Sequence, residues 1–374
     1  MNRDCKLFIP GPCDVDEDVL EAMRRPVQRS YGAKWISIYN ETRDLLKQVF
    51  QTRNELFIVP GPGSAGLDMA LGSLLAAGEK VIVARNGFFG ERLAFIAECN
   101  GLNVVHVSAP VGQPLDPDDL RRALAAHPDA LLVALVHHET TTTVLNPMHD
   151  LAAATREGGR VLLVDAVSSL GGAELPVDAW GIDICVTASN KCLEAPPGLA
   201  LISVGPRAWD VIGRHTRTNH GWYLDLRTWR WYAENWGTWH PTPITMPTNT
   251  IMALRASLLK IAEVGLKAHI AKHARACQTV RSGLRKLGFE LLVPDEFAAP
   301  TATAVKQRRE FTVAELIQWL ETERGICIAG GIAELAGKIF RVGHLGKATT
   351  DEYLAEFLSA MAEFLHHKGV VTPQ

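Results

Sequence analysis

The chain has 374 residues, of which 47% are hydrophobic and 21% are charged, and its formal net charge is -3. This length favours two domains over one, because a single hydrophobic core stops growing at about 250–300 residues. The small negative net charge creates no basic field that would attract nucleic acid or an anionic membrane, so we expect neither partner. We expect a small-molecule ligand instead.

The seven cysteines form no C-x-x-C pair, and no apolar run reaches the length of a membrane span. Neither a disulfide framework nor a zinc ribbon is therefore indicated, and we expect no metal. The thiols are expected to be reduced in a reducing compartment, which predicts a cytoplasmic location.

The chain divides into three predicted parts. Residues 1–15 contain the proline-rich stretch 7–12, which predicts an extended arm. Residues 16–264 alternate continuous apolar runs with stretches of helical spacing, which predicts a mainly parallel sheet covered by helices on both faces. The predicted strands are residues 56–59, 80–84, 104–107, 130–136, 161–164, 182–187 and 199–203.

The second half of the chain begins with an aromatic segment. Residues 222–239 hold five tryptophans and two tyrosines on a predicted loop, which suggests a pocket wall, a subunit contact or simple packing. A helix is predicted from residue 249 past Gly265 to residue 287, with a hinge at the glycine. Residues 265–374 then predict a smaller α/β domain.

Two ionisable residues end neighbouring predicted strands. Asp165 follows the run 161–164, and Lys191 follows the run 182–187. Taken alone, Asp165 is best interpreted as a helix cap and Lys191 as a solvated residue at the end of a strand. Together they lie where ligands bind open α/β sheets and suit pyridoxal 5'-phosphate (PLP), because lysine forms a Schiff base and aspartate keeps the pyridine nitrogen protonated.

A glycine-rich turn follows the first strand of the predicted sheet. Residues 61–66 (GPGSAG) fit G-x-G-x-x-G, but Pro62 lies inside the turn and the next strand ends at Arg85 instead of an acidic residue. Arg85 would suit a 2'-phosphate, so an NADP-dependent oxidoreductase is one interpretation. Free N-H groups at a helix start also bind other phosphates, and the same turn would serve PLP.

Other polar residues have ordinary explanations beside functional ones. Residues 137–139 (HHE) lack a third metal ligand at suitable spacing, and His269 and His273 are expected on a solvated helix surface. Arg341 is flanked by apolar residues, so its guanidinium is expected to form two hydrogen bonds with one anion. This anion is either a structural carboxylate or a substrate carboxylate. Phe89 either packs in the core or stacks on a flat cofactor.

In this order the motifs resemble those of the class V aminotransferases of PLP fold type I, in particular the alanine-glyoxylate and serine-pyruvate (serine-glyoxylate) transaminase group. The matching segments are residues 10–12 (PGP), 50–54 (FQTRN), 86–90 (NGFFG), 138–142 (HETTT), 164–172 (VDAVSSLGG), 190–193 (NKCL), 195–198 (APPG) and 341–343 (RVG). The resemblance implies an α/β fold with a large domain, built on a seven-stranded-type sheet, and a smaller C-terminal domain.

The resemblance also implies roles for single residues in a homodimer with shared active sites. Lys191 would form the Schiff base and Asp165 would pair with the pyridine nitrogen, while Arg341 and the Gly11 backbone would bind the substrate carboxylate. The remaining implied cofactor contacts are Gly63, Ser64 and Asn190 at the phosphate, Phe89 and Val167 on the ring faces, Thr140 near the ring oxygen, and Thr245 on the phosphate of the neighbouring subunit.

The activity implied is a ping-pong transfer of an amino group from a small amino acid of alanine or serine type to glyoxylate or pyruvate. Pyridoxamine-pyruvate, ureidoglycine-glyoxylate and aminoethylphosphonate-pyruvate transamination are the alternatives within the family. Two departures concern the phosphate: Pro62 stands where relatives place a serine, and Thr242 where a tyrosine is expected. Cys327, the candidate nucleophile of a cysteine desulfurase, is expected to be buried in a strand.

Overall fold

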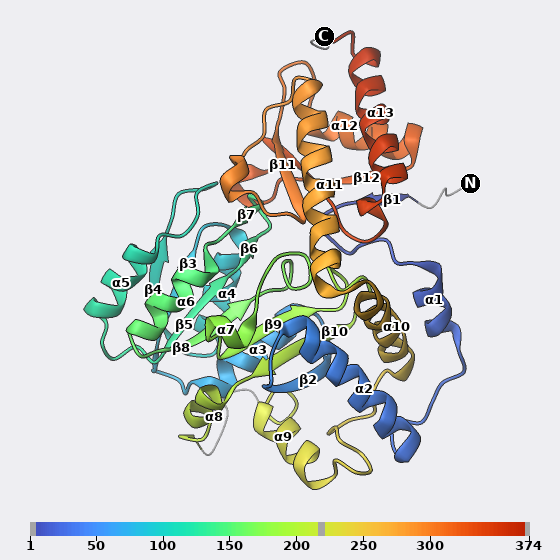
Figure 1. Ribbon diagram of the computed structural model, residues 1–374. Helices are drawn as coiled ribbons and strands as arrows, with labels where there is room; N and C mark the ends of the chain where they lie inside the picture. The colour runs from blue at the N-terminus through green and yellow to red at the C-terminus, as the bar shows by residue number, and fades with distance from the viewer. Residues whose placement is uncertain (1–4, 216–220, 371–374) are drawn as a thin grey trace.

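The computed structural model describes residues 5–215 and 221–370. It has a large sheet at the centre of the wider part of the molecule and a small sheet beside α11, α12 and α13 near the C-terminus (Figure 1). Residues 1–4 of the predicted arm and 371–374 of the predicted C-terminal domain lie outside the described residues. The domain boundaries stay a prediction.

The large sheet has seven strands in the order β2-β10-β9-β8-β5-β3-β4. Strand β10 is antiparallel to its neighbours β2 and β9, whereas the pairs β9/β8, β8/β5, β5/β3 and β3/β4 are parallel. This confirms the predicted mainly parallel sheet. The strands are β2 (Glu55–Pro60), β3 (Lys80–Arg85), β4 (Asn103–Ser108), β5 (Leu132–Val136), β8 (Val161–Asp165), β9 (Ile184–Ala188) and β10 (Leu199–Val204).

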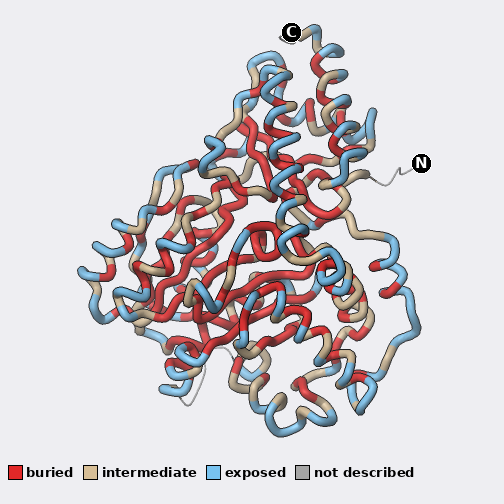
Figure 2. Tube along the Cα trace, viewed as in Figure 1, coloured by how far each residue is buried: buried red, intermediate tan, exposed pale blue. Residues whose placement is uncertain are grey.

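Helices cover both faces of this sheet, because every residue of β5, β8, β9 and β10 is buried. Helices α3 and α4 pack together against one face, and α5 and α6 pack together against the other. Figure 2 shows the buried strands enclosed by helices with exposed outer sides. The helices of this part are α1 (Glu17–Arg24), α2 (Ala33–Phe50), α3 (Gly63–Leu74), α4 (Phe88–Cys99), α5 (Pro117–Ala126), α6 (Met148–Glu157), α7 (Val177–Trp180), α8 (Pro206–Ile212), α9 (Leu226–Asn235) and α10 (Thr248–Val264), with a hairpin of β6 (His138–Glu139) and β7 (Val144–Leu145).

The small sheet has the order β1-β12-β13-β11, and it draws in the N-terminal arm. Strand β1 is its edge strand and pairs in parallel with β12, which suits an arm whose following prolines cannot donate to a central ladder. Phe8 stacks on Phe357 at a centroid distance of 4.8 Å within a separate apolar cluster. The elements are β1 (Lys6–Phe8), β11 (Ala302–Lys306), β12 (Ile326–Gly330), β13 (Ile339–Gly343), α11 (Leu266–Lys286), α12 (Val313–Trp319), α13 (Asp351–His367) and the short turns η1 (Asp295–Phe297), η2 (Leu320–Arg324), η3 (Ala333–Leu335) and η4 (Lys347–Thr349).

Local sequence explains where several helices start and stop. The Asp116 carboxylate caps α5 by accepting from Asp118 N at 2.8 Å, and Pro117 occupies the first helical position. At Gly265 the backbone takes φ +81°, so the single predicted helix of residues 249–287 is divided into α10 and α11.

The predicted loop of residues 222–239 is wrong in its middle, where α9 forms. The Asp225 side chain accepts from Arg227 N at 2.9 Å and starts this helix. Trp229 is buried on α9, whereas Trp222, Trp231, Trp236 and Trp239 remain exposed. The sequence pattern did not predict this helix, because only Leu226 and Trp229 are buried in it and they are too few to give a clear helical spacing.

The predicted solvated surface for His269 and His273 is also wrong. Their side chains are 2% and 0% exposed, because this side of α11 packs on the loop that follows Lys191. His269 Nε2 lies 2.8 Å from the Cys192 carbonyl oxygen. Among the helices that the structure describes, none combines the length and apolarity needed to cross a bilayer.

Candidate active site

Asp165 and Lys191 lie in one cavity at the carboxyl edge of the large sheet. Strands β8 and β9 are parallel neighbours in which Asp165 pairs with Val186. The chain leaves β9 at Ala188, and Lys191 follows in the next loop. Both side chains line a cavity of about 180 Å³. The strand order therefore brings together two residues that are 26 positions apart.

Asp165 is held in a setting that makes its carboxyl a weaker acid than a free aspartate. Its Oδ1 accepts a hydrogen bond from Val167 N at 2.9 Å. Burial raises the pKa of the carboxyl to about 6, against the opposing effect of that N-H. Such a group can share a proton with a ring nitrogen bound beside it.

Lys191 is held by the N-terminal arm. Its Nζ donates to the Pro10 carbonyl oxygen at 2.6 Å. Burial lowers the pKa of Lys191, which increases the share of neutral amine available as a nucleophile or base. Gly11 has φ +118°, and a Cβ there would overlap the Lys191 side chain, so the close approach requires glycine.

The first turn of α3 lies at one end of this cavity. The helix begins at Gly63, and Pro62 before it provides no side-chain cap. Ala65 N donates to the Pro62 carbonyl oxygen at 2.9 Å, which leaves the N-H groups of Gly63 and Ser64 to face an anion. Gly63, Ser64 and Asn190 all line the cavity. A Cβ on Gly63 would lie 2.6 Å from Val167 Cγ2, so only glycine allows this approach.

Phe89 and Val167 form apolar walls of the cavity. Phe89 is placed by the start of α4, where the buried Glu139 carboxylate accepts from Phe89 N at 3.1 Å and Gly90 N at 3.0 Å. It also accepts from Thr141 N at 3.0 Å. Glu139, considered in the sequence only as a metal ligand, is thus a helix cap that positions an aromatic wall.

Thr140 lines the cavity next to a residue that the sequence analysis missed. Its Oγ1 donates to Ser168 Oγ at 3.0 Å. His138 also lines the cavity, and burial lowers the pKa of its imidazole to about 4. His138 Nδ1 lies 3.1 Å from the Ser168 carbonyl oxygen, and Nε2 is buried without a hydrogen-bond partner in the described part of the chain. The motif of residues 138–142 contains His138 and not His137, but it does not indicate that the imidazole lines the cavity.

Arg92 is a second missed cavity residue. It lies one helical turn after Phe89, and its guanidinium is 5.0 Å from the centroid of that ring. The side chain is exposed at the rim. Its spacing from Phe89 on α4 is the sequence pattern that could have found it.

Arg341 lies on β13 of the small sheet and is 7% exposed. Its Nε donates to Gly330 O at 3.0 Å and its Nη1 to Thr140 O at 3.1 Å. Over the described residues none of its hydrogen bonds reaches a carboxylate. Arg341 does not itself line the cavity, but Thr140 connects it to the wall.

Thr245 and Thr242 do not join this cavity. Thr245 is exposed, and its proposed contact with a neighbouring subunit stays a prediction. Thr242 is buried, and its hydroxyl donates to Ile244 O at 3.1 Å. This hydroxyl is therefore committed to its own turn.

Cys327 differs from the predicted buried packing, because on β12 it is half-buried. Burial, and next the neighbouring Cys5 thiol, raise the pKa of Cys327 to about 12. A thiol with so little thiolate is a poor nucleophile near neutral pH.

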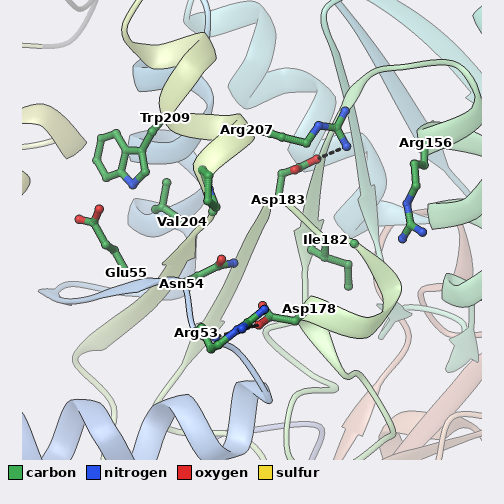
Figure 3. A pocket seen from close by; sticks show the side chains of 13 residues that line it. Arg53, Asn54, Glu55, Arg156, Asp178, Ile182, Asp183, Val204, Arg207 and Trp209 are labelled. Carbon is green, nitrogen blue, oxygen red and sulfur yellow. Dashed lines mark hydrogen bonds and ion pairs between the residues drawn. The ribbon is translucent and has the colours of Figure 1, made fainter.

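A larger cavity, of about 660 Å³, lies at the opposite edge of the large sheet (Figure 3). Two of its three arginines face carboxylates, with Arg207 Nη1 3.6 Å from Asp183 Oδ2 and Arg53 Nε 3.7 Å from Asp178 Oδ2. No lysine is among its lining residues. This larger cavity is not the better candidate for the active site, since its three arginines are balanced by three carboxylates.

Comparison with known proteins identifies one family. The family description "Aminotransferase class-V" matches residues 14–343. The chain is 36% identical to an uncharacterized aminotransferase of Methanocaldococcus jannaschii, over 93% of this chain and 90% of that protein. It is also 36% identical to a protein named soluble hydrogenase, small subunit, of Synechococcus sp., over 99% and 95% of the two chains.

Solved structures agree with this match. The crystal structure of ureidoglycine-glyoxylate aminotransferase from Bacillus subtilis superposes with a TM-score of 0.94 at 30% identity, covering 100% of this chain and 96% of that one. Agreement of this quality extends across both sheets, since the whole chain is covered.

Proposed function

This chain belongs to the class V aminotransferases, a family of PLP-dependent transaminases, and from that premise we propose that it binds PLP and transfers an amino group from a small amino acid of alanine or serine type to glyoxylate or pyruvate. The observation that carries the proposal is the common cavity of Lys191, Asp165 and the first turn of α3. Glyoxylate is the acceptor named for the Bacillus subtilis structure.

The residues of the cavity fit PLP. The α3 N-terminus, with Gly63 and Ser64, suits a phosphate, and Asn190 adds an amide beside it. The buried Asp165 carboxyl suits a pyridine nitrogen, and Lys191 provides the amine for covalent attachment. Val167 and Phe89 both line this cavity, and their apolar side chains suit the faces of a flat ring.

Three side chains and one backbone segment then divide the work of the reaction. When bound, PLP supplies an acceptor for the electrons released at the substrate Cα. Lys191 Nζ would take the proton from the substrate Cα as general base and then, as general acid, deliver it to the imine carbon that PLP supplies instead of returning it to Cα. Asp165 holds a proton on the pyridine nitrogen. Arg341 binds the substrate carboxylate together with the Gly11 backbone.

Phe89, Val167 and Thr140 hold the ring in place. The two apolar side chains exclude water from both faces, and the Thr140 hydroxyl lies near the ring oxygen. The amino acid leaves as a 2-oxo acid before the acceptor enters, because one carboxylate-binding arginine serves both substrates in turn. Together these steps give a ping-pong transamination.

A homodimer is part of the proposal. The exposed Thr245 is available to reach the phosphate in a neighbouring subunit, and the exposed tryptophans of residues 222–239 supply apolar contact area. Thr242 is not available for this role, since its hydroxyl is bonded to Ile244 O.

One observation favours a second candidate, ureidoglycine-glyoxylate transamination. His138 Nε2 is a buried acceptor without a partner in the described part of the chain, and Arg92 lies at the rim of the same cavity. A ureido group has N-H donors for His138 and a carbonyl oxygen for Arg92. Alanine uses neither.

Borohydride reduction followed by peptide mapping tests the cofactor assignment. We expect PLP fixed to Lys191 and no fixation in K191A, which should also lose transamination. Unmodified Lys191 together with bound nicotinamide would favour the dinucleotide enzyme instead. Donors alanine, serine, ureidoglycine, aminoethylphosphonate and pyridoxamine, each paired with glyoxylate and with pyruvate, then separate the substrate candidates. Light scattering of the PLP-loaded protein tests the dimer.

A further inference from the structure

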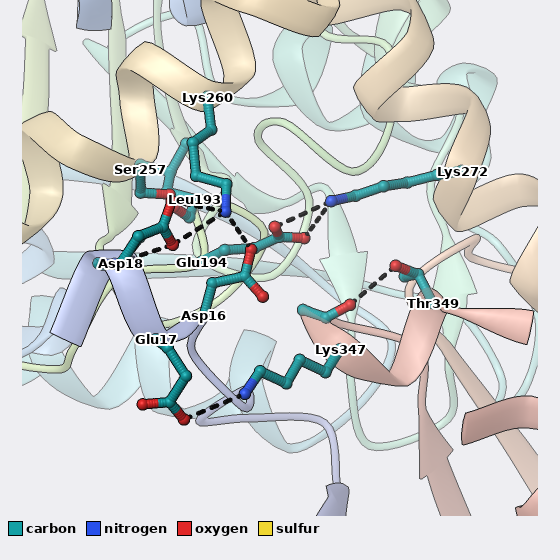
Figure 4. Close-up of polar contacts among 12 residues, drawn as sticks. Asp16, Glu17, Asp18, Leu193, Glu194, Ser257, Lys260, Lys272, Lys347 and Thr349 are labelled. Atoms are coloured by element: carbon teal, nitrogen blue, oxygen red, sulfur yellow. Dashed lines mark hydrogen bonds and ion pairs between the residues drawn. The ribbon is translucent and has the colours of Figure 1, made fainter. Parts of the chain in front are cut away.

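Three ionisable side chains meet beneath the loop that follows Lys191. They are Glu194 of that loop and His269 and His273 of α11, and one ligand atom from each lies within 4.8 Å of the other two. Figure 4 shows the Glu194 carboxylate between its loop and Lys272 of α11. The sequence predicts no metal here because both histidines are expected on a solvated helix surface. Both histidines are buried, so that reason against a metal no longer holds.

The hydrogen bonds of the two imidazoles leave one bare nitrogen on each. His273 Nδ1 lies 2.9 Å from the His269 carbonyl oxygen, which can only accept, so Nδ1 carries the proton. His273 Nε2 then has a free lone pair, is buried without a hydrogen-bond partner among the described residues, and lies 3.8 Å from Glu194 Oε1. By the same reasoning His269 Nε2 donates to the Cys192 carbonyl oxygen, which leaves Nδ1 bare.

This is the arrangement by which proteins prepare histidines for a metal. Metal-binding histidines usually donate their other ring N-H to a carbonyl or carboxylate, which fixes the tautomer and the ring orientation. Two imidazole nitrogens and one carboxylate oxygen suit a borderline ion, whereas calcium and magnesium prefer all-oxygen sites. We propose that Glu194, His269 and His273 bind one Zn²⁺ ion per chain.

Lys272 limits the strength of this site. Its Nζ lies 2.7 Å from Glu194 Oε1 and 2.9 Å from Oε2, so an ammonium already neutralises the carboxylate. A divalent ion bound to Glu194 is repelled by this charge. Removing the Lys272 charge should therefore strengthen zinc binding, an effect that a plain buried ion pair does not predict.

The zinc site connects to the loop that carries Lys191. Glu194 N donates to the Lys191 carbonyl oxygen at 3.0 Å, and Glu194 itself has φ +53°, a conformation that side chains rarely adopt. His269 holds the next carbonyl, that of Cys192. Zinc would thus brace this turn from behind, outside the cofactor cavity, and its role is structural. The proposal does not depend on the transaminase substrate.

Zinc binding to the full-length, PLP-loaded protein tests the proposal. After removal of metals with EDTA, the protein is dialysed against Zn²⁺, and bound zinc is counted by mass spectrometry. We expect one ion per chain in the wild type. E194Q and H273Q should each weaken binding by at least about 100-fold, since loss of an outer partner alone weakens it by ~10–100-fold. K272M should tighten binding by about 10-fold or more.

The matched control is H149Q, which removes an exposed histidine of α6 that lies beside Asp150. It should leave stoichiometry and affinity unchanged. Equal zinc binding by wild type, E194Q and H273Q would place the zinc on surface histidines and overturn the proposal. Failure of both the wild type and K272M to bind zinc would also overturn it, leaving a buried ion pair. If H273Q does not fold, E194Q, which keeps the side-chain shape, decides.

Discussion

Lys191 Nζ and the Pro10 carbonyl oxygen are joined by a hydrogen bond of 2.6 Å. Pro10 belongs to the arm whose strand β1 lies in the small sheet, whereas Lys191 follows β9 of the large sheet. Cys13 N also donates to the Asn190 carbonyl oxygen at 3.2 Å. The N-terminal arm therefore helps to position the lysine, and changes in the arm should affect the chemistry.

The substitution G11A should reduce turnover by about 10-fold or more, because its Cβ overlaps the Lys191 side chain and overpacking costs about 1–3 kcal/mol. G78A is the matched control, since Gly78 also has positive φ (+88°) but a Cβ there meets nothing within 4 Å. Both variants should lose about 1–2 kcal/mol of stability in urea unfolding. Equal kcat values for the two variants would contradict this role of the arm.

The stability of the cofactor-free protein should depend on pH through Asp165. Burial raises the pKa of this carboxyl from 3.8 to about 6, so the folded state holds a proton that the unfolded state releases. Stability is therefore lost as pH rises from about 4 to about 6, by up to about 3 kcal/mol. D165N should remove this loss, and urea unfolding at pH 4 and pH 7 measures it. The exposed D210N variant controls for loss of one charge, and an identical pH effect in D165N and wild type would contradict the prediction.

The substitution R341Q should raise the KM for the amino acid by about 10–100-fold, because a charge-assisted hydrogen bond contributes about 1.5–3 kcal/mol. The absorbance of bound cofactor should not change, since Arg341 does not line the cavity. Arg281 offers a matched comparison, as it is buried but its Nε already donates to Asp295 Oδ1 at 2.6 Å. R281Q should lower stability and leave KM unchanged. A normal KM in R341Q would remove Arg341 from substrate binding.

The substitution E139Q should loosen Phe89 without changing any cavity-lining side chain. The carboxylate accepts from the first N-H groups of α4, and the neutral amide keeps its shape but weakens these charge-assisted bonds. We expect a loss of about 1–3 kcal/mol in urea unfolding and weaker cofactor binding, measured by dialysis of the loaded protein. E157Q, an exposed control, should leave cofactor affinity unchanged. Loss of stability with unchanged affinity would show that the cap acts on the fold alone.

The large sheet could be predicted because its strands are buried on both faces, and continuous apolar runs are unambiguous when they alternate with helical spacing. The α9 helix could not be predicted, since tryptophans occur at buried and exposed positions alike. Of the two tryptophans in this helix, Trp229 is buried and Trp231 is exposed. His269 and His273 were misplaced for a related reason. Two polar residues on one helix side look solvated until the element that packs on them is known.

Sequence by itself determined the family motifs, the fold and the Asp165 and Lys191 pair, because these depend on local runs and on strand ends that must share one edge of a parallel sheet. Tertiary structure alone decided which distant atoms meet. It placed Pro10 on Lys191, Glu139 at the start of α4, His138 in the cavity, and Glu194 against two histidines of α11. Such contacts join segments far apart in the chain, and local spacing carries no information about their distance.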